Sequence, residues 1–435
     1  MTTFQPVQPS SETARQRALW MSTIAFTACF AVWTILSIIG IRIKQQLGLN
    51  ETQFGLLVGT PILTGSLVRL VLGIWTGRYG GRVVYTFTML AAAAATFLLA
   101  HAATYAQMLF AALGVGLAGG SFAVGVAYVS RFFPAERQGT ALGIFGAGNV
   151  GAAVTTFLAP FVLLAWGWQA VAQVWAGALA VMAVVFWFCT SDEPAFRRQT
   201  GRTDRKSFWL ELAPLKNLQV WRFALYYFFV FGGFVALALW LPRYLTGVYG
   251  FGIGTAGMIG AAYSIPATVF RAYGGMLSDR IGARTVMYAT FTVSAAATLI
   301  LSLPAMDFVV HGMGGPISFH FEIGPIAFIA VIGVLGFFMS LGKAAVYKHI
   351  PVYYPDSVGA VGGLVGMIGG LGGFILPIAF GALDDLTGLW TSCFMLLFIL
   401  VTAALAWMHL AVRQTERQGA GPAPAPNQAY GYVAQ

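Results

Sequence analysis

Long apolar runs separated by short polar segments make up most of this chain, and the pattern predicts helices that cross a membrane. Each run holds about 20 residues, the length that a helix needs to cross the hydrocarbon core of a bilayer. We place twelve runs, at residues 19–41, 54–76, 83–102, 105–130, 140–165, 169–190, 221–246, 254–277, 284–303, 324–348, 359–382 and 389–411. Such runs are too long for the strands of a membrane barrel, so the expected fold class is an all-α integral membrane protein.

Lys and Arg residues set the expected orientation of these helices. Of the 24 basic residues, 18 fall in the alternate segments that include both termini, and three fall in the opposite segments. Because cytoplasmic segments carry an excess of Lys and Arg, we expect both termini in the cytoplasm. The remaining three basic residues, Arg69, Arg271 and Lys343, lie inside predicted helices.

The composition agrees with a membrane protein. The chain is 58% hydrophobic and 9% charged, and its mean hydropathy is +0.77. The formal net charge of +10 comes from the basic segments, and it indicates contact with anionic membrane lipids rather than with nucleic acid. The three cysteines lie singly in apolar runs and the five histidines are scattered, so the sequence predicts no disulfide, metal site or cofactor.

A long polar segment divides the chain into two parts with six predicted helices each. The expected parts are an N-terminal cytoplasmic segment (1–18), a six-helix bundle (19–190), a cytoplasmic linker (191–220), a second six-helix bundle (221–411) and a disordered cytoplasmic tail (412–435). Residues 55–82 also resemble residues 257–284 after a shift of 202. Parallel repeats of this kind predict two pseudo-symmetric bundles with a binding site between them, near the middle of the membrane.

The repeat superimposes two arginines, Arg69 and Arg271, in the interior of apolar helices. A guanidinium at membrane depth costs roughly 2.5–3.5 kcal/mol, so it usually faces a partner or a water-filled cavity. Two arginines in equivalent positions predict that both bundles converge on one anionic ligand. We therefore expect an anion carrier.

Two further patterns occur in both halves. The loops GRYGGR (77–82) and SDRIGAR (278–284) resemble the signature between the second and third helices of major facilitator transporters, with the residues Arg78, Arg82, Asp279, Arg280 and Arg284. Glycine-rich segments at 114–151 and 333–373 predict close approach of helices, or sliding between them. The glycines of interest are Gly119, Gly120, Gly143, Gly146, Gly148, Gly151, Gly363, Gly366 and Gly370.

The glycine-rich segment 114–151 resembles the nitrate signature of the NarK-type nitrate/nitrite porter family of the major facilitator superfamily. It has glycines and a phenylalanine, then Phe-Pro, then spaced glycines that end in Gly-x-Gly-Asn-x-Gly. The arginine pair resembles the family's substrate-binding pair, and the similarity covers about residues 19–411. The resemblance implies the major facilitator fold, with twelve helices in two bundles. It also implies secondary active transport of nitrate, with nitrite as a second substrate, across a bacterial cytoplasmic (inner) membrane by alternating access.

The same resemblance implies the residues of the substrate site. The two arginines would clamp the planar anion from opposite sides, because the guanidinium is a planar fork of donors that stays charged. Tyr227 would donate a hydrogen bond, and Phe231, one turn later, would lie against the face of the anion. Phe122 and Asn149 occupy signature positions that line the family's site. The expected substrate-binding residues are Arg69, Arg271, Tyr227, Asn149, Phe122 and Phe231.

The sequence leaves the coupling mechanism open. All fourteen acidic residues fall in loops, tails or the ends of predicted helices, so the candidates for coupling are Lys343 and His349 on the tenth predicted helix. A transporter whose empty site carries two positive charges should return to the other side of the membrane with difficulty when no anion is bound. This favours nitrate/nitrite antiport. A co-transported proton, or loss of a proton from Lys343, would relieve that constraint. Segment 342–355 resembles the type I branch of the family, which is associated with nitrate/proton symport, and this favours symport.

Two other functions are weighed against nitrate transport. A transporter of another small anion, such as formate or phosphate, would also suit paired arginines. A membrane anion sensor would need a soluble signalling domain, and the tail after residue 411 is short and poor in apolar residues. The sequence pairs no nucleophile with a base, so we do not expect an enzyme. One chain supplies both halves of the site, so we expect a monomer.

Overall fold

The computed structural model describes residues 12–133, 135–191, 217–353 and 358–418. The first half of the chain contains α1 (Glu12–Trp33), α2 (Leu36–Leu47), α3 (Glu51–Tyr79), α4 (Gly81–Leu99), α5 (Tyr105–Val115), α6 (Leu117–Ser130), α7 (Ala135–Gly146), the 3₁₀-helix η1 (Ala147–Val150), α8 (Gly151–Trp166) and α9 (Trp168–Cys189). The second half contains α12 (Leu218–Tyr227), the π-helix η3 (Phe228–Gly233), α13 (Phe234–Val248), α14 (Ile253–Ile281), α15 (Ala283–Leu301), β1 (Met306–Gly312), β2 (Gly315–Phe321), α16 (Pro325–Tyr353), α17 (Val358–Thr387) and α18 (Ser392–Gln418).

The helices form the bundle that the hydrophobic pattern predicts. Within the described residues, eleven helical segments are long and apolar enough to cross a membrane. Several of them are built from consecutive helices, as α1 and α2 are. The remaining long helix, α3, has 29 residues, which corresponds to about 43 Å. The prediction of a helical, multi-pass membrane fold is confirmed.

The internal repeat recurs in the helix boundaries. Shifting α3 by 202 residues gives the bounds of α14, and shifting α4 by the same amount gives those of α15. Each pair of helices is separated by one glycine in the left-handed half of φ space, Gly80 at φ 89° and Gly282 at φ 87°. A side chain would be strained at that φ, so glycine ends one helix and allows the next to start at once.

Some ends and one element differ from the sequence prediction. The first helix begins at Glu12 rather than 19, and the last ends at Gln418 rather than 411, because polar residues continue both helices beyond their apolar parts. Most of the expected linker (192–216) and the tail from 419 lie outside the described residues. The sequence analysis predicted no strands, whereas residues 306–321 form an antiparallel hairpin.

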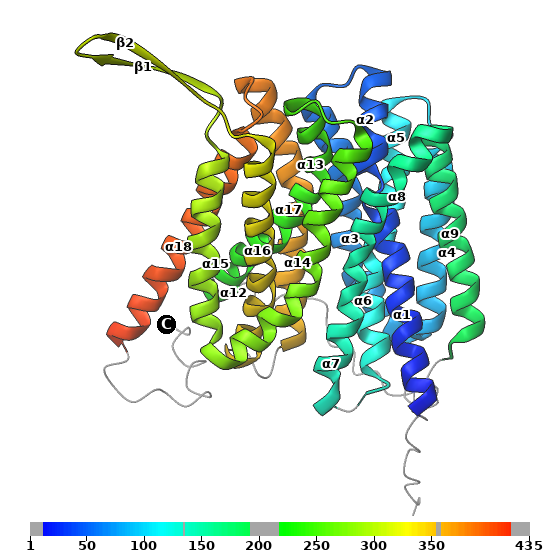
Figure 1. Ribbon diagram of the computed structural model, residues 1–435. Coiled ribbons are helices and arrows are strands. Elements are labelled where there is room, and N and C mark those ends of the chain that lie inside the picture. The colour runs from blue at the N-terminus through cyan, green and yellow to red at the C-terminus, as the bar shows by residue number, and fades with distance from the viewer. Residues whose placement is uncertain (1–11, 134, 192–216, 354–357, 419–435) are drawn as a thin grey trace, which may run out of the picture.

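The two halves of the chain lie side by side (Figure 1), with α1–α9 on the right and α12–α18 on the left. We call the end of the bundle where α1 begins and α18 ends the terminal face, and the opposite end, which carries β1 and β2, the hairpin face. The halves meet through α3 with α17 and through α8 with α14. Glycines allow these contacts, because a Cβ at Gly55 would overlap the carbonyl of Pro377 and one at Gly257 the carbonyl of Thr156.

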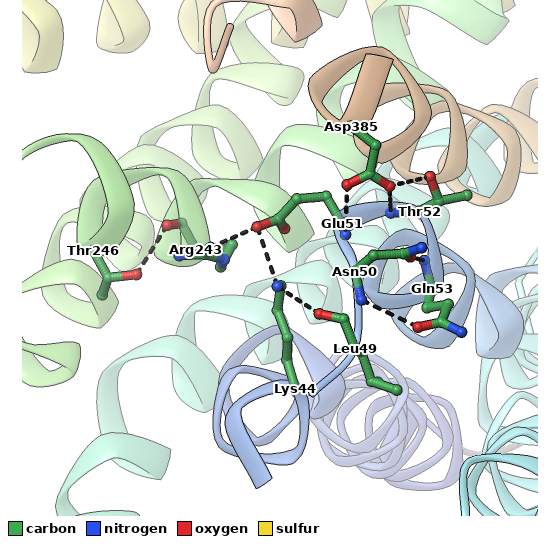
Figure 2. Close-up of polar contacts among 9 residues, drawn as sticks. All are labelled: Lys44, Leu49, Asn50, Glu51, Thr52, Gln53, Arg243, Thr246 and Asp385. Atoms are coloured by element: carbon green, nitrogen blue, oxygen red, sulfur yellow. Dashed lines mark hydrogen bonds and ion pairs between the residues drawn. The ribbon is translucent and has the colours of Figure 1, made fainter. Parts of the chain in front are cut away.

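A charged network joins the halves near the hairpin face (Figure 2). The Glu51 carboxylate accepts a hydrogen bond from the Arg243 guanidinium at 2.6 Å and pairs with the Lys44 ammonium at 3.2 Å. The side chains are 12–19% exposed. Lys44 and Glu51 belong to the first half and Arg243 to α13 of the second, so the network ties the halves together at this face.

The start of α3 is capped from the second half. The Asp385 carboxylate, in the last turn of α17, accepts hydrogen bonds from the backbone N–H groups of Glu51 and Thr52 at 3.0 and 2.8 Å. These are unpaired donors of the first helical turn, where a negative charge is favourable. Asn50 and Gln53 complete a capping box within the chain segment itself. Contact between the halves at the hairpin face therefore forms an ion pair and also supplies acceptors for the free N–H groups at the start of α3.

We expect Glu51→Gln to loosen this closure. The substitution removes the carboxylate charge that pairs with both Arg243 and Lys44 in a mostly buried network. A loss of about 1–3 kcal/mol shifts a two-state population roughly 5- to 150-fold. The measurement is labelling of a cysteine at Ala123, between the halves, by an impermeant thiol reagent applied from the hairpin face of proteoliposomes. Labelling should increase.

Arg42→Gln is the matched control, because Arg42 is exposed and, within the described residues, donates its side-chain hydrogen bond to Gln45 of its own helix. This variant should label like the parent protein. Equal labelling of both variants would show that the network does not hold the face closed.

Candidate functional site

A cavity of about 450 Å³ lies between the two halves. It is lined by parts of α1, α3, α6, α7 and η1 from the first half, and of α12, η3, α14, α16 and α17 from the second. Its lining residues on α16 and α17 come from the ends of these helices at the terminal face, whereas the contacts through Gly55 and Glu51 lie toward the hairpin face. The closed network and the cavity therefore occupy opposite ends of the interface between halves.

All six residues that the sequence analysis assigned to the substrate site line this cavity. They come from both halves of the chain. The two that lie farthest apart in the sequence, Arg69 and Arg271, are separated by 202 positions. The residues are Arg69, Phe122 and Asn149 from the first half, and Tyr227, Phe231 and Arg271 from the second. The fold thus brings together what the chain keeps far apart.

Arg69 is held by aromatic rings and a backbone carbonyl. Its Cζ lies 5.8 Å from the ring centre of Trp33 and 5.7 Å from that of Phe122, and its Nε donates to the Gly119 carbonyl at 3.4 Å. Trp33 is itself fixed, since its Nε1 donates to the Pro61 carbonyl at 2.8 Å. The ring faces favour a cation at this position.

Arg271 faces the same cavity from α14. It is half-buried, and within the described residues no carboxylate pairs with it or with Arg69. The lining contains no Asp or Glu among the residues that the structure describes. Two cations in a largely apolar cavity without a counter-charge favour an anionic ligand.

A tyrosine that the sequence analysis did not single out completes the wall. Tyr347 of α16 lines the cavity and lies close enough to both arginines for electrostatic interaction. Its hydroxyl donates to the Gly362 carbonyl of α17 at 3.0 Å, and its ring packs edge-on against Tyr227 at 4.9 Å. Only its position, one turn after Lys343, could have drawn attention to it in the sequence.

The tyrosine and phenylalanine of the expected seventh-helix motif form one stack. Tyr227 and Phe231 are nearly parallel, with ring centres 5.0 Å apart and an interplanar angle of 7°. Phe231 lies in the π-helix η3, a type of helix that is rare and often found at functional sites. Gly232 and Gly369 let η3 and α17 approach closely, because a Cβ on Gly232 would overlap the Gly369 carbonyl and one on Gly369 would overlap Tyr227.

The two candidates for coupling lie beside the cavity rather than in its lining. Lys343 is 3% exposed, and its Nζ lies 3.1 Å from the ring centre of Phe234. No hydrogen bond or ion pair to Lys343 occurs within the described residues, and Arg271 is its charged neighbour. His349 stacks on Phe223 at 5.8 Å. Lys343 is thus close to the cationic site, whereas His349 packs among aromatic rings.

The signature glycines fall into two groups. In the first group a Cβ would collide with a neighbour, and in the second it would meet open space. The first group is Gly119, Gly120, Gly148, Gly151, Gly366 and Gly370, and the second is Gly143, Gly146 and Gly363. Close packing therefore explains the first group. The second lies on α7 and α17, at or near the cavity.

The residues of the repeated loop motif contact their own halves. Arg82 donates from Nε and a terminal nitrogen to the Trp187 carbonyl at 2.9 and 2.6 Å, which joins α4 to α9. Asp279 pairs with Lys348, which joins α14 to α16. Arg280 and Arg284 are exposed, and the side chain of Arg78 lies outside the described part of the chain. These contacts stabilise each half and do not reach the cavity.

Comparison with known proteins identifies the family. A sequence model described as the Major Facilitator Superfamily matches residues 21–319 and 249–431. A probable nitrate/nitrite antiporter, NarK1 of Thermus thermophilus, is 42% identical over 93% of this chain and 94% of its own length. The chain belongs to the NarK-type nitrate/nitrite porter family of the Major Facilitator Superfamily. Members of this superfamily are membrane transporters and not enzymes, so the prediction that the protein is not an enzyme is confirmed.

Other relatives of the transporter agree with this family. A probable nitrate/nitrite transporter, NarK2 of Mycobacterium tuberculosis, is 32% identical over 92% of this chain and 95% of its own. A nitrite extrusion protein of Bacillus subtilis is 27% identical over 92% and 96%. Among solved structures, a bacterial homologue of the human lysosomal transporter Spinster superimposes with a TM-score of 0.73 at 17% identity, covering 96% of this chain and 100% of that one. That likeness shows the fold.

We expect two glycine variants on α17 of the transporter to differ in stability. A Cβ at Gly370 would lie 2.6 Å from the Ser66 hydroxyl oxygen and 3.5 Å from Arg69, whereas one at Gly363 meets nothing within 4 Å. Overpacking costs about 1–3 kcal/mol, so Gly370→Ala should lower the melting temperature of the purified protein by several degrees. Gly363→Ala should leave it unchanged or raise it, because alanine favours helix. Equal melting temperatures would contradict the close contact between Gly370 of α17 and Ser66 of α3.

Proposed function

We propose that this protein transports nitrate and nitrite across the bacterial cytoplasmic membrane by alternating access, and that the anion binds between Arg69 and Arg271. The observation that carries the proposal is the pair of symmetry-related arginines at one cavity, without a carboxylate in its described lining. The names of the relatives, nitrate/nitrite antiporter and transporter, support these substrates.

The chemistry of the lining suits a small planar anion. Nitrate and nitrite spread one negative charge over oxygens in a plane, and each guanidinium offers parallel N–H donors in a plane. Tyr227 and Asn149 would donate further hydrogen bonds, while Phe122 and Phe231 would pack against the faces of the anion. Tyr347 lines the same cavity, with its hydroxyl bonded to the Gly362 carbonyl.

Alternating access follows from the distribution of charge. Without an anion, the arginines of the two halves repel each other and keep the halves apart around the cavity. A bound anion lowers that repulsion, so the halves can close at the terminal face while the Glu51 network opens at the other. Glycines of the second group, such as Gly143 and Gly363, leave room for this movement. The basic residues predict that the terminal face is cytoplasmic, and one chain holds the whole site as a monomer.

Arginine substitutions test the binding site. We expect Arg69→Lys and Arg271→Lys each to weaken nitrate binding by about 1.5–3 kcal/mol, on the order of 10- to 100-fold, because lysine lacks the planar fork of donors. Titration calorimetry on the purified protein measures this affinity. Arg42→Lys, at an exposed position of the hairpin face, is the control and should bind as the parent does. Unchanged affinity in both variants would place the anion elsewhere.

For coupling we propose nitrate/proton symport, with Lys343 as the group that exchanges a proton. Lys343 is buried and has Arg271 as its charged neighbour, and within the described residues no carboxylate pairs with it. Nitrate/nitrite antiport is the second candidate. It is favoured by the name of the Thermus thermophilus relative and by the lack of a carboxylate in the described lining of the cavity.

Uptake into proteoliposomes separates these two modes. Symport requires nitrate uptake driven by an inward proton gradient with no anion inside, and we expect Lys343→Ala to abolish this uptake. Lys348→Ala is the control on the same helix, because Lys348 is exposed and pairs with Asp279. Uptake that needs internal nitrite or nitrate, and that Lys343→Ala leaves intact, would establish antiport and remove Lys343 from the coupling mechanism.

A further inference from the structure

The β1–β2 hairpin has one apolar face that nothing in the described chain covers. The strands pair in antiparallel register from Met306 with Phe321 to Gly312 with Gly315, so alternate pairs share a face. One face carries six apolar side chains, and the other carries mostly polar ones. The apolar face consists of Met306, Phe308, Val310, Ile317, Phe319 and Phe321, and the opposite face of Asp307, Val309, His311, Pro316, Ser318 and His320.

The side chains of the apolar face are open to their surroundings. Phe308 and Phe319, which form a cross-strand pair, are 46% and 53% exposed, and Val310 and Ile317 are 52% and 51% exposed. Figure 1 shows the hairpin projecting from the end of the bundle beyond α15, with no helix against its outer part. A two-stranded sheet is marginally stable in water unless its apolar face is covered. The hairpin therefore requires a covering surface.

The position of the hairpin indicates what that surface is. It connects α15 to α16, two membrane-crossing segments, through four residues before β1 and three after β2. Exposed apolar residues lie on both sides of its base. Leu299, Ile300 and Leu303 precede β1, and Ile326, which is 84% exposed, follows β2. The apolar face thus continues from helix surfaces that are exposed to lipid.

The opposite face of the hairpin carries charged and polar side chains. The His320 imidazole hydrogen-bonds the Asp307 carboxylate at 2.8 Å and lies 3.6 Å from the Glu322 carboxylate. Hydrogen bonds to Asp307 and then Glu322 raise the pKa of His320 above its usual value. Ion pairs of this kind stay in the aqueous phase, so the hairpin presents one apolar and one charged side, as amphipathic elements of membrane interfaces do.

We propose that the β1–β2 hairpin is an interfacial anchor whose apolar face lies on the lipid surface beside α15 and α16. Phe308, Phe319 and Phe321 enter the boundary between head groups and acyl chains, and Asp307 and His320 face water. The occupant is the bilayer, and the anchor fixes the second half of the protein at the hairpin face of the membrane.

Spin labels on neighbouring residues of β2 test the anchor. Phe319→Cys and Ser318→Cys place labels on opposite faces, one residue apart. Both are made with Cys189→Ser, since Cys29 and Cys393 are buried. In vesicles of phosphatidylcholine and phosphatidylglycerol, power saturation compares accessibility to oxygen, which dissolves in lipid, and to a water-soluble nickel complex. The ratio of oxygen to nickel accessibility should be several-fold higher at position 319 than at 318.

Phe308→Cys and Val309→Cys form a second pair on β1, and the same contrast is expected there. Equal, high nickel accessibility at both positions of each pair would overturn the proposal, because the apolar face would then be in water. Strong spin–spin broadening between labels at position 319, diluted away by unlabelled protein, would overturn it in favour of a second copy of this chain as the cover.

Discussion

Two guanidinium groups share one cavity inside a bundle of apolar helices, and the described lining supplies no negative charge to balance them. In a medium of low dielectric constant their mutual repulsion and their loss of hydration are both large. Aromatic faces around Arg69 compensate part of that cost. In the proposed mechanism, a bound anion compensates the remaining cost, because its negative charge lies between the arginines of the two halves.

The opposite end of the interface has the complementary design. There the charges are already paired, with Glu51 of the first half between Lys44 and Arg243, and with Asp385 at the first turn of α3. One end of the interface is therefore complete in the protein alone, and in the proposed mechanism the other becomes complete only with an anion. Close contacts at glycines hold α3 against α17 in the same interface.

The sequence predicted the internal repeat better than the ends of the elements. Its repeat of 202 residues reappears in the bounds of α3, α4, α14 and α15, because identical spacing of apolar residues and glycines produces identical helices. The six expected site residues line one cavity, although their roles stay a proposal. Helix ends differed by up to seven residues, since polar side chains continue a helix into the aqueous phase without an apolar signal.

By itself, the sequence determined that long apolar helices make up most of the chain, that two repeats are present and that each repeat carries an arginine inside an apolar helix. These are properties of residue type and spacing along one chain. The tertiary structure alone decided that Tyr347 stands near both arginines, that Asp385 caps α3 and that Glu51 bridges the halves. Most of these contacts join residues from different halves of the chain, and only the packing of the helices fixes which of them meet. The amphipathic hairpin depends on both the sequence and the tertiary structure. Its alternating apolar and polar residues are visible in the sequence, but the pairing register of its strands depends on a turn at Met313 and Gly314.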